Sequence, residues 1–369
     1  MQRSGFQLCF LLGALLSFAF ALLAAALGSS APGSLTSGPP MLEPRSGHSA
    51  TLLPDGKVLI AGGMRRNQDF YKSVELYDPA TARFERAGDM TIARVGQAAV
   101  LLPSGKVLIA GGWSGKEATD SAELYDPAAR RFTAVAKMTS RRGNPSATLL
   151  ADGDVLIAGG ADHDTPGGIS AAEVFHPATL SFQAISPMHY ARISHTATLL
   201  KDGRVLIVGG RGETLAAVAE LYDPKTRKFG ETGRLMTARY KHTAGLLPDG
   251  RVLIAGGSDE RDWKGKFNSA EIYDPVVGKF SATAAMSDAR FKLPETTVVL
   301  NNGELLIAGG SREVEIFDPA SGKFKVAAGK MHDLRHFMTE TKLKDGSVLL
   351  AGGYPNDDLG TCETWFFRP

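Results

Sequence analysis

Two sets of charged residues recur along the chain, at spacings that could bring opposite charges together. Acidic members are Glu75, Glu123, Glu173, Glu220, Glu271, Glu315 and Glu363, and basic members are Arg45, Arg94, Arg142, Arg192, Arg239, Lys292 and Arg335. An isolated buried charge costs several kcal/mol, so one glutamate and one cation per repeat predict buried ion pairs of the scaffold. The alternative is that the cations surround an opening and attract a carboxylate, sulfate or phosphate ligand.

The histidines offer a second kind of chemistry. His48, His195 and His242 occupy one position of the repeat, and the remaining repeats carry other residue types there. We interpret them as packing groups between repeats, with metal ligation as the alternative. The segment Asp162-His163-Asp164 could bind a cation weakly, but a solvated loop is the preferred interpretation. We therefore expect no metal and no cofactor.

Two of the three tryptophans break the repeat. Trp113 directly follows a diglycine, and Trp263 stands in a charged segment. Arg65, Arg66 and Tyr354 lie in equivalent segments, which vary most in length. Aromatic residues on loops of a rigid scaffold are typical of recognition surfaces. We predict that these five residues frame a ligand surface together with the basic set.

Short hairpins must position these residues. Seven diglycines follow apolar runs such as Val58–Ala61, and a turn dipeptide such as Asp55-Gly56 precedes each run. These turn dipeptides favour the positive φ angles of two-residue hairpin loops. The diglycines are Gly62-Gly63, Gly111-Gly112, Gly159-Gly160, Gly209-Gly210, Gly256-Gly257, Gly309-Gly310 and Gly352-Gly353.

Each hairpin is followed by two further strands. The third is read from segments such as Glu75-Leu76-Tyr77-Asp78-Pro79, and the fourth begins at a phenylalanine such as Phe84. Four strands in about 47 residues predict one propeller blade. The chain ends before a fourth strand of the seventh repeat, whereas residues 33–41 match that strand's spacing. We predict an all-β, seven-bladed propeller with four antiparallel strands per blade, whose last blade is closed by the N-terminal strand.

The repeat resembles the Kelch family over about residues 33–369, through the Arg45–His48 segment, the diglycines and the Glu-Leu-Tyr-Asp-Pro segments. It is also similar to the propeller domain of galactose oxidase. The Kelch resemblance implies that arginines at one mouth can bind acidic partner peptides. The oxidase resemblance implies a copper held by two histidines and two tyrosines, one cross-linked to a cysteine. No Tyr-His pair occurs in a late repeat, so we expect no copper-radical chemistry.

Residues 1–28 are predicted to be a signal peptide, because an apolar run follows Arg3 and small residues follow the run. An uncleaved membrane anchor is the alternative. Residues 29–369 then form a single domain that is secreted, periplasmic or on the cell surface. With Lys+Arg 41 and Asp+Glu 39 the chain is not a generally basic nucleic-acid binder. Cleavage would leave one thiol, Cys362, and we expect a monomer.

These observations favour a binding or interaction module. The expected ligand is an acidic protein segment or a glycan, bound on the face that carries the loops between second and third strands and between blades. One alternative is a carbohydrate-active enzyme, mutarotase- or oxidase-like, that uses the same mouth. Another is a structural protein of the cell envelope. The sequence contains neither a Gly-x-Ser-x-Gly nor a His-Glu-x-x-His motif, so the enzyme interpretation is the weaker one.

Overall fold

The computed structural model describes residues 33–66, 69–163, 167–293, 296–355 and 359–369. Seven four-stranded antiparallel sheets follow one another around a ring, which confirms the predicted propeller. Each repeat supplies strands A to D from the inside outwards, and a two-stranded ribbon, β8 (Trp113–Ser114) with β9 (Glu117–Ala118), extends blade 2. No helix in the described part of the chain has the length and apolarity needed to cross a membrane.

The strands of the first four blades are given in the order A to D. Blade 1 has β2 (Ser49–Leu52), β3 (Val58–Ala61), β4 (Ser73–Asp78) and β5 (Arg83–Asp89); blade 2 has β6 (Ala98–Leu101), β7 (Val107–Ala110), β10 (Ala122–Asp126) and β11 (Arg131–Ala134). Blade 3 has β12 (Ser146–Leu149), β13 (Val155–Ala158), β14 (Ala172–His176) and β15 (Ser181–Ala184); blade 4 has β16 (Thr196–Leu199), β17 (Val205–Val208), β18 (Val218–Asp223) and β19 (Lys228–Arg234).

The remaining three blades complete the ring. Blade 5 has β20 (Thr243–Leu246), β21 (Val252–Ala255), β22 (Ala270–Asp274) and β23 (Lys279–Ala282), with a single 3₁₀ turn, η1 (Asp262–Lys264), between β21 and β22. Blade 6 has β24 (Thr297–Val299), β25 (Leu305–Ile307), β26 (Glu315–Asp318) and β27 (Lys323–Val326); blade 7 has β28 (Thr339–Lys342), β29 (Val348–Ala351), β30 (Thr364–Arg368) and β1 (Ser34–Ser37).

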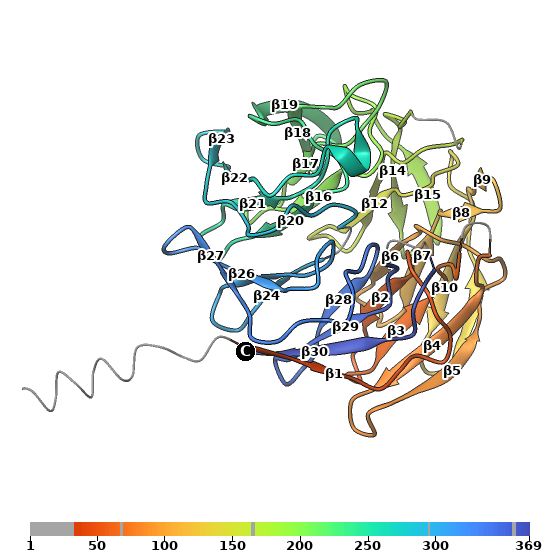
Figure 1. The fold of residues 1–369 in the computed structure, drawn as a ribbon. Helices are drawn as coiled ribbons and strands as arrows, with labels where there is room; N and C mark the ends of the chain where they lie inside the picture. Colours follow the sequence, from red (N-terminus) through yellow and green to blue (C-terminus); the bar gives the residue numbers. More distant parts are fainter. Residues whose placement is uncertain (1–32, 67–68, 164–166, 294–295, 356–358) are drawn as a thin grey trace, which may run out of the picture.

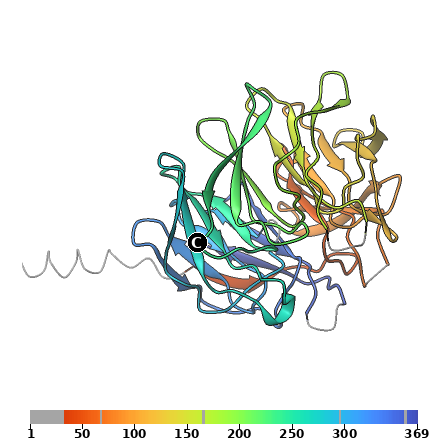
Figure 2. The ribbon, with the colours of Figure 1, turned by 90° about the horizontal axis from the view of Figure 1, so that it is seen from above.

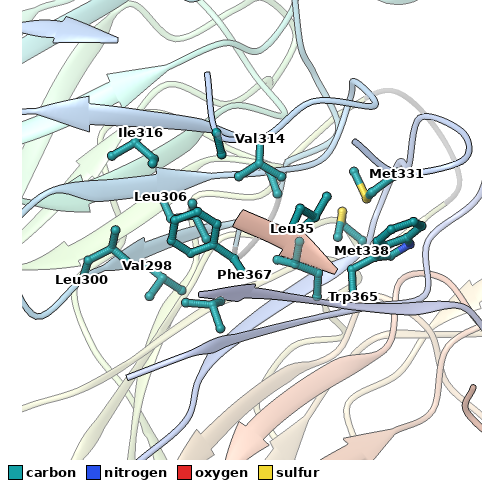
Figure 3. Packing of buried hydrophobic residues seen from close by; sticks show 14 residues of the cluster. Leu35, Val298, Leu300, Leu306, Val314, Ile316, Met331, Met338, Trp365 and Phe367 are labelled. Carbon is teal, nitrogen blue, oxygen red and sulfur yellow. The ribbon is translucent and has the colours of Figure 1, made fainter. Parts of the chain in front are cut away.

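The N-terminal strand closes the ring as predicted. β1 pairs antiparallel with β30, with Leu35 opposite Phe367, and the red β1 lies among the blue strands of the last sheet in both views (Figures 1 and 2). Leu35 is buried in a cluster that joins blades 6 and 7 and includes Ile316, Trp365 and Phe367 (Figure 3). Closure therefore buries an edge that β30 would otherwise expose to pairing with other chains.

The core lies between neighbouring sheets. Strand B is buried at every position in each blade, as in Val58–Ala61. In blades 1 to 6, strand C pairs its aromatic residue with the phenylalanine of strand D, as in Tyr77 and Phe84 with ring centroids 5.0 Å apart. The seven A strands form the innermost layer. Because strands alternate in direction, the B–C and D–A loops emerge on one face, here called the loop face.

Candidate functional site

The arginines before strand A are internal to the blades. The guanidinium of Arg94 is fully buried, its Nη2 lies 2.7 Å from Glu123 Oε1, and its Nη1 donates to the carbonyl of Gly111 at 2.8 Å. Glu123 also accepts the backbone N–H of Thr91 at 2.8 Å. Each pair thus ties a D–A loop to strand C of the blade that it enters. Equivalent pairs join Arg45 to Glu75, Arg142 to Glu173, Arg192 to Glu220, Arg239 to Glu271 and Arg290 to Glu315.

These contacts support the scaffold interpretation of the basic set, with one correction. Arg290, and not Lys292, occupies the arginine position of blade 6, where its Nη2 lies 2.7 Å from Glu315 Oε1. The loop is two residues longer in this blade, so counting back from strand A selects the wrong cation. In blade 7, Arg335 is buried but Glu363 is 37% exposed, and His332 contacts the same carboxylate at 3.3 Å.

The residue two positions after each arginine forms the mouth of the central channel. These seven residues, called the mouth ring, all have left-handed backbones with φ from +49° to +62°; they are Gly47, Gly96, Asn144, Ser194, Lys241, Lys292 and Phe337. Backbone hydrogen bonds join neighbours: Gly96 N–H donates to the Gly47 carbonyl at 2.9 Å, and Phe337 N–H to the Lys292 carbonyl at 3.1 Å. Five positions keep a side chain in a conformation that glycine adopts most easily.

A cavity of about 410 Å³ continues inward from this ring. Its lining includes Met64 and Trp113 from the B–C loops and a belt of hydroxyls from the A strands. The belt side chains are Ser146, Thr196, Thr243, Thr297 and Thr339. This volume is in the range of small-molecule sites, and the lining combines hydrogen-bonding groups with aromatic surface.

The three repeated histidines connect neighbouring blades. Each Nε2 lies near a hydroxyl of the preceding A strand: His48 to Thr339 Oγ1 at 3.0 Å, His195 to Ser146 Oγ at 2.9 Å, and His242 to Thr196 Oγ1 at 3.0 Å. Burial, with a nearby arginine, lowers the pKa of His48 and of His195 to about 3. The packing interpretation is confirmed, and these imidazoles are neutral at physiological pH.

Lys292 lies among aromatic rings contributed by three blades. Its Nζ is 4.1 Å from the ring centroid of Trp263, 5.2 Å from those of Phe291 and Tyr354, and 5.7 Å from that of Phe337. The ammonium also donates to the Tyr354 hydroxyl at 2.7 Å. Cation–π contacts of this kind contribute up to about 2 kcal/mol each when desolvated. They hold this side of the mouth in a defined arrangement.

An ion pair between Lys241 and Asp262 lies on the same side of the mouth as Lys292. Lys241 Nζ donates to Asp262 Oδ1 at 2.9 Å, and the Tyr240 hydroxyl donates to the same oxygen at 3.0 Å. Burial and the neighbouring Asp262 raise the pKa of Tyr240 to about 12. Lys241, Asp262 and Lys292 all have positive φ, at +55°, +53° and +58°. Left-handed backbones of non-glycine residues store strain of about 1–3 kcal/mol and cluster at functional sites.

The other predicted site residues have mixed locations. Trp113 is half-buried at the cavity, Trp263 is 39% exposed, Tyr354 is buried, and Arg65 and Arg66 are exposed in the first B–C loop. Asp162 is partly buried and His163 is exposed, with 3.6 Å between His163 Nε2 and Asp162 Oδ2. Asp164 lies outside the described residues. Within the described ranges, no three His, Cys, Asp or Glu side chains are placed to hold one metal ion.

Sequence reasoning missed the mouth ring because its residue types differ from blade to blade. A signal was present, since glycine occupies this position in two blades. A repeat position that is glycine in some copies and bulky in others suggests a left-handed backbone that carries selected side chains. Positions that repeat the same residue type belong to the scaffold. The mouth ring instead repeats a left-handed backbone conformation with different residue types.

Residues 44–91 and 94–139 match the family model of the Kelch motif. These matched repeats form blades 1 and 2 of the seven-bladed ring. The protein is a seven-bladed β-propeller whose first two blades carry Kelch motifs. No curated protein sequence matches it. A solved structure similar to this Kelch propeller is a fungal alcohol oxidase of the AA5 family in complex with copper, at 17% identity and a TM-score of 0.71, over 92% of this chain and 76% of the oxidase chain. At that identity the likeness shows the fold alone.

The mouth of this Kelch propeller does not fit a copper ion. His336 and Tyr354 have ring centroids 5.7 Å apart, but the ammonium of Lys292 contacts the Tyr354 hydroxyl and would repel a second cation. His336 is fully buried, and its Nδ1 lies 3.3 Å from the Phe291 carbonyl. No chemical step is therefore assigned to a metal here.

Proposed function

We propose that the chain is an exported binding module that takes an acidic protein segment or a glycan at the mouth on the loop face. The observation that carries the proposal is the mouth ring. Five of its seven residues keep side chains on left-handed backbones around a cavity of about 410 Å³. If the ring served folding alone, glycine at all seven positions would give the least backbone strain. The retained side chains therefore favour a role in recognition.

The charge available to a ligand comes from a smaller set than the sequence predicted. The buried arginines are neutralised by strand C glutamates, so they do not contribute free positive charge at the surface. Lys241 is partly exposed and lines the cavity, although its ammonium is also paired with Asp262 at 2.9 Å, while Arg65 and Arg66 are exposed in the adjacent B–C loop. An acidic ligand would meet these cations at the rim and aromatic surface inside.

The test is a ligand titration with matched variants. Mono- and disaccharides, their uronates and hexaglutamate are titrated into the full chain, and bound heat or thermal shift is recorded. A ligand at about 100 times its Kd adds roughly 2.7 kcal/mol to stability, which is measurable. Lys241→Met should weaken binding of an acidic probe, whereas Lys225→Met, on a C–D turn of the opposite face, should not. Equal effects of both variants would contradict a site at the mouth.

A carbohydrate-active enzyme is the second candidate, favoured by the contact of Lys241, Asp262 and Tyr240. A carboxylate held between an ammonium and a phenol on strained backbones could position or move a proton. The two candidates differ in their response to Asp262→Asn. An enzyme should lose turnover of a bound sugar while keeping affinity, and a binder should show no turnover before or after the change.

Export is proposed on the predicted signal peptide, residues 1–28. The proposal is tested by N-terminal sequencing of the protein recovered from the extracytoplasmic fraction. A first residue near Ser29 supports cleavage, and an intact Met1 in the membrane fraction supports the anchor.

A further inference from the structure

The mouth ring is asymmetric. On the side of blades 1 to 4 its members are small, namely Gly47, Gly96, Asn144 and Ser194, and on the side of blades 5 to 7 they are large, namely Lys241, Lys292 and Phe337. The large side is filled further by Trp263 and Tyr354, which contact Lys292. Cavity-lining residues of the ring include all four small members, with Lys241 and Phe337 at the opposite edge. The open space therefore lies on the side of blades 1 to 4.

Trp113 forms one wall of this open half. A Cβ built on Gly143 would come within 2.1 Å of Trp113 Cε2, and one built on Gly96 within 3.6 Å of Trp113 Cδ1. The indole thus packs directly against the backbone at position 143, where any side chain larger than that of glycine would collide with it. Equivalent positions in the other blades carry larger residues, such as Val95, Ile193 and Tyr240. Gly143 makes room for a half-exposed aromatic surface that faces the cavity.

Polar groups lie on the inner side of the same space. Ser146 and Thr196 line the cavity below Asn144 and Ser194. Each hydroxyl has one donor and two acceptor sites. Ser146 uses two of them, because it contacts His195 Nε2 at 2.9 Å and donates to the Ala158 carbonyl at 3.3 Å, whereas Thr196 contacts His242 Nε2 at 3.0 Å. The A strands are the innermost strands of their sheets, so their unpaired backbone edges also face the channel. The open half therefore combines one flat apolar surface with several hydrogen-bonding groups.

We propose that a pyranose ring binds in the open half of the mouth, with one face on Trp113 and its hydroxyls toward Asn144, Ser146 and Thr196. This inference rests on the proposed function and narrows its ligand from an acidic segment or glycan to a sugar. A pyranose has the matching chemistry, since its C–H face is apolar and its equatorial edge is polar. A site of this small volume suits one or two sugar rings.

The test compares the half-buried Trp113 with the exposed Trp263, which lies three blades away. The full chain and its Trp113→Ala, Trp113→Phe and Trp263→Ala variants are titrated with glucose, galactose, mannose, N-acetylglucosamine, their uronates, matching disaccharides and hexaglutamate. The best sugar should bind at least tenfold more weakly to Trp113→Ala, within threefold of the parent to Trp113→Phe, and within twofold to Trp263→Ala. Gly143→Ala, which displaces the indole without deleting it, should also weaken sugar binding tenfold.

The outcomes separate the two proposals. Hexaglutamate binding that is lost in Lys241→Met, without any sugar binding, would overturn the sugar site and leave the mouth function standing. Sugar binding that is weakened more by Trp263→Ala than by Trp113→Ala would do the same. Sugar binding that is insensitive to Trp113→Ala, Trp263→Ala and Lys241→Met would overturn both, as would a panel in which no probe binds.

Discussion

Arg94 Nη2 lies 2.7 Å from Glu123 Oε1, with neither side chain more than 1% exposed. This relationship recurs in six blades with buried arginines and explains why the charged residues are so regular in sequence. A buried ion pair contributes little net stability but is costly to break. The pairs therefore fix the D–A loops, and with them the backbone of the mouth ring.

Removing one partner of such a pair should destabilise the fold strongly. Arg94→Met leaves Glu123 buried without its cation, and we expect a loss of about 3–5 kcal/mol in the free energy of unfolding. The double variant Arg94→Met/Glu123→Leu should recover part of this loss, because no charge stays buried. Urea denaturation of the three proteins measures both effects. A single variant within about 1 kcal/mol of the parent would argue against the pair as a scaffold element.

If the N-terminal strand closes the ring, a single core substitution in β1 should lower the stability of the protein. Leu35 is 7% exposed and packs between blades 6 and 7. Leu35→Ala should cost about 2–5 kcal/mol, as large-to-small changes in a core do. Ser34→Ala, at the neighbouring exposed position of β1, serves as the control. Equal melting temperatures for both variants would mean that β1 does not hold the ring closed.

Acid should destabilise the protein through its buried histidines. The unfolded chain binds protons near pH 6.5, whereas burial lowers the pKa of His48 and His195 to about 3 in the folded state. The stabilisation that comes from keeping these histidines neutral is thus fully present above pH 6.5. It is lost as the pH falls toward 3. His195→Gln should flatten this dependence, since Gln97 already occupies the matching position and donates to Ser49 at 3.3 Å. Unfolding between pH 3.5 and 7.5 measures the slope, and an unchanged slope would refute the assignment.

Glu340 should act in the opposite direction. It lies in β28, buried, and its Oε1 accepts the Ala308 N–H of blade 6 at 2.6 Å. Burial raises the pKa of Glu340 from 4.5 to about 8. The folded state therefore holds a proton that the unfolded chain releases, and stability falls as the pH rises from about 4.5 through 8. Glu340→Gln should remove this alkaline loss. A parent protein equally stable at pH 6 and pH 8.5 would contradict the shift.

The position of Trp113 at the mouth can be tested by substituting Gly143, which does not have a positive φ angle. Gly143→Ala should move the indole of Trp113, because a Cβ there would come within 2.1 Å of it. We expect altered tryptophan fluorescence with little change in blade stability. Gly230→Ala is the matched control, since no atom lies within 4 Å of its added Cβ. Identical emission spectra for the two variants would place Trp113 elsewhere.

Most of the scaffold could be predicted because it repeats. The diglycines, Asp-Gly turns and strand C glutamates define seven blades, and the missing last strand points to residues 33–41, within which β1 spans Ser34–Ser37. Spacing failed at Lys292, where Arg290 lies 19 residues before Gly309 and Arg239 lies 17 before Gly256. The contacts of Lys292 with Trp263 and Tyr354 join three blades. No local pattern encodes such contacts, because they depend on how neighbouring blades pack around the channel.

The central claim is that a ligand binds at the mouth on the loop face. The most direct measurement is calorimetric titration of the best probe from the sugar and hexaglutamate panel into four proteins: the parent, Lys241→Met, Trp113→Ala and the opposite-face control Lys225→Met. At least one mouth variant should weaken binding tenfold or more, and the control should match the parent. Full affinity in both mouth variants, or a loss confined to the control, would contradict the claim.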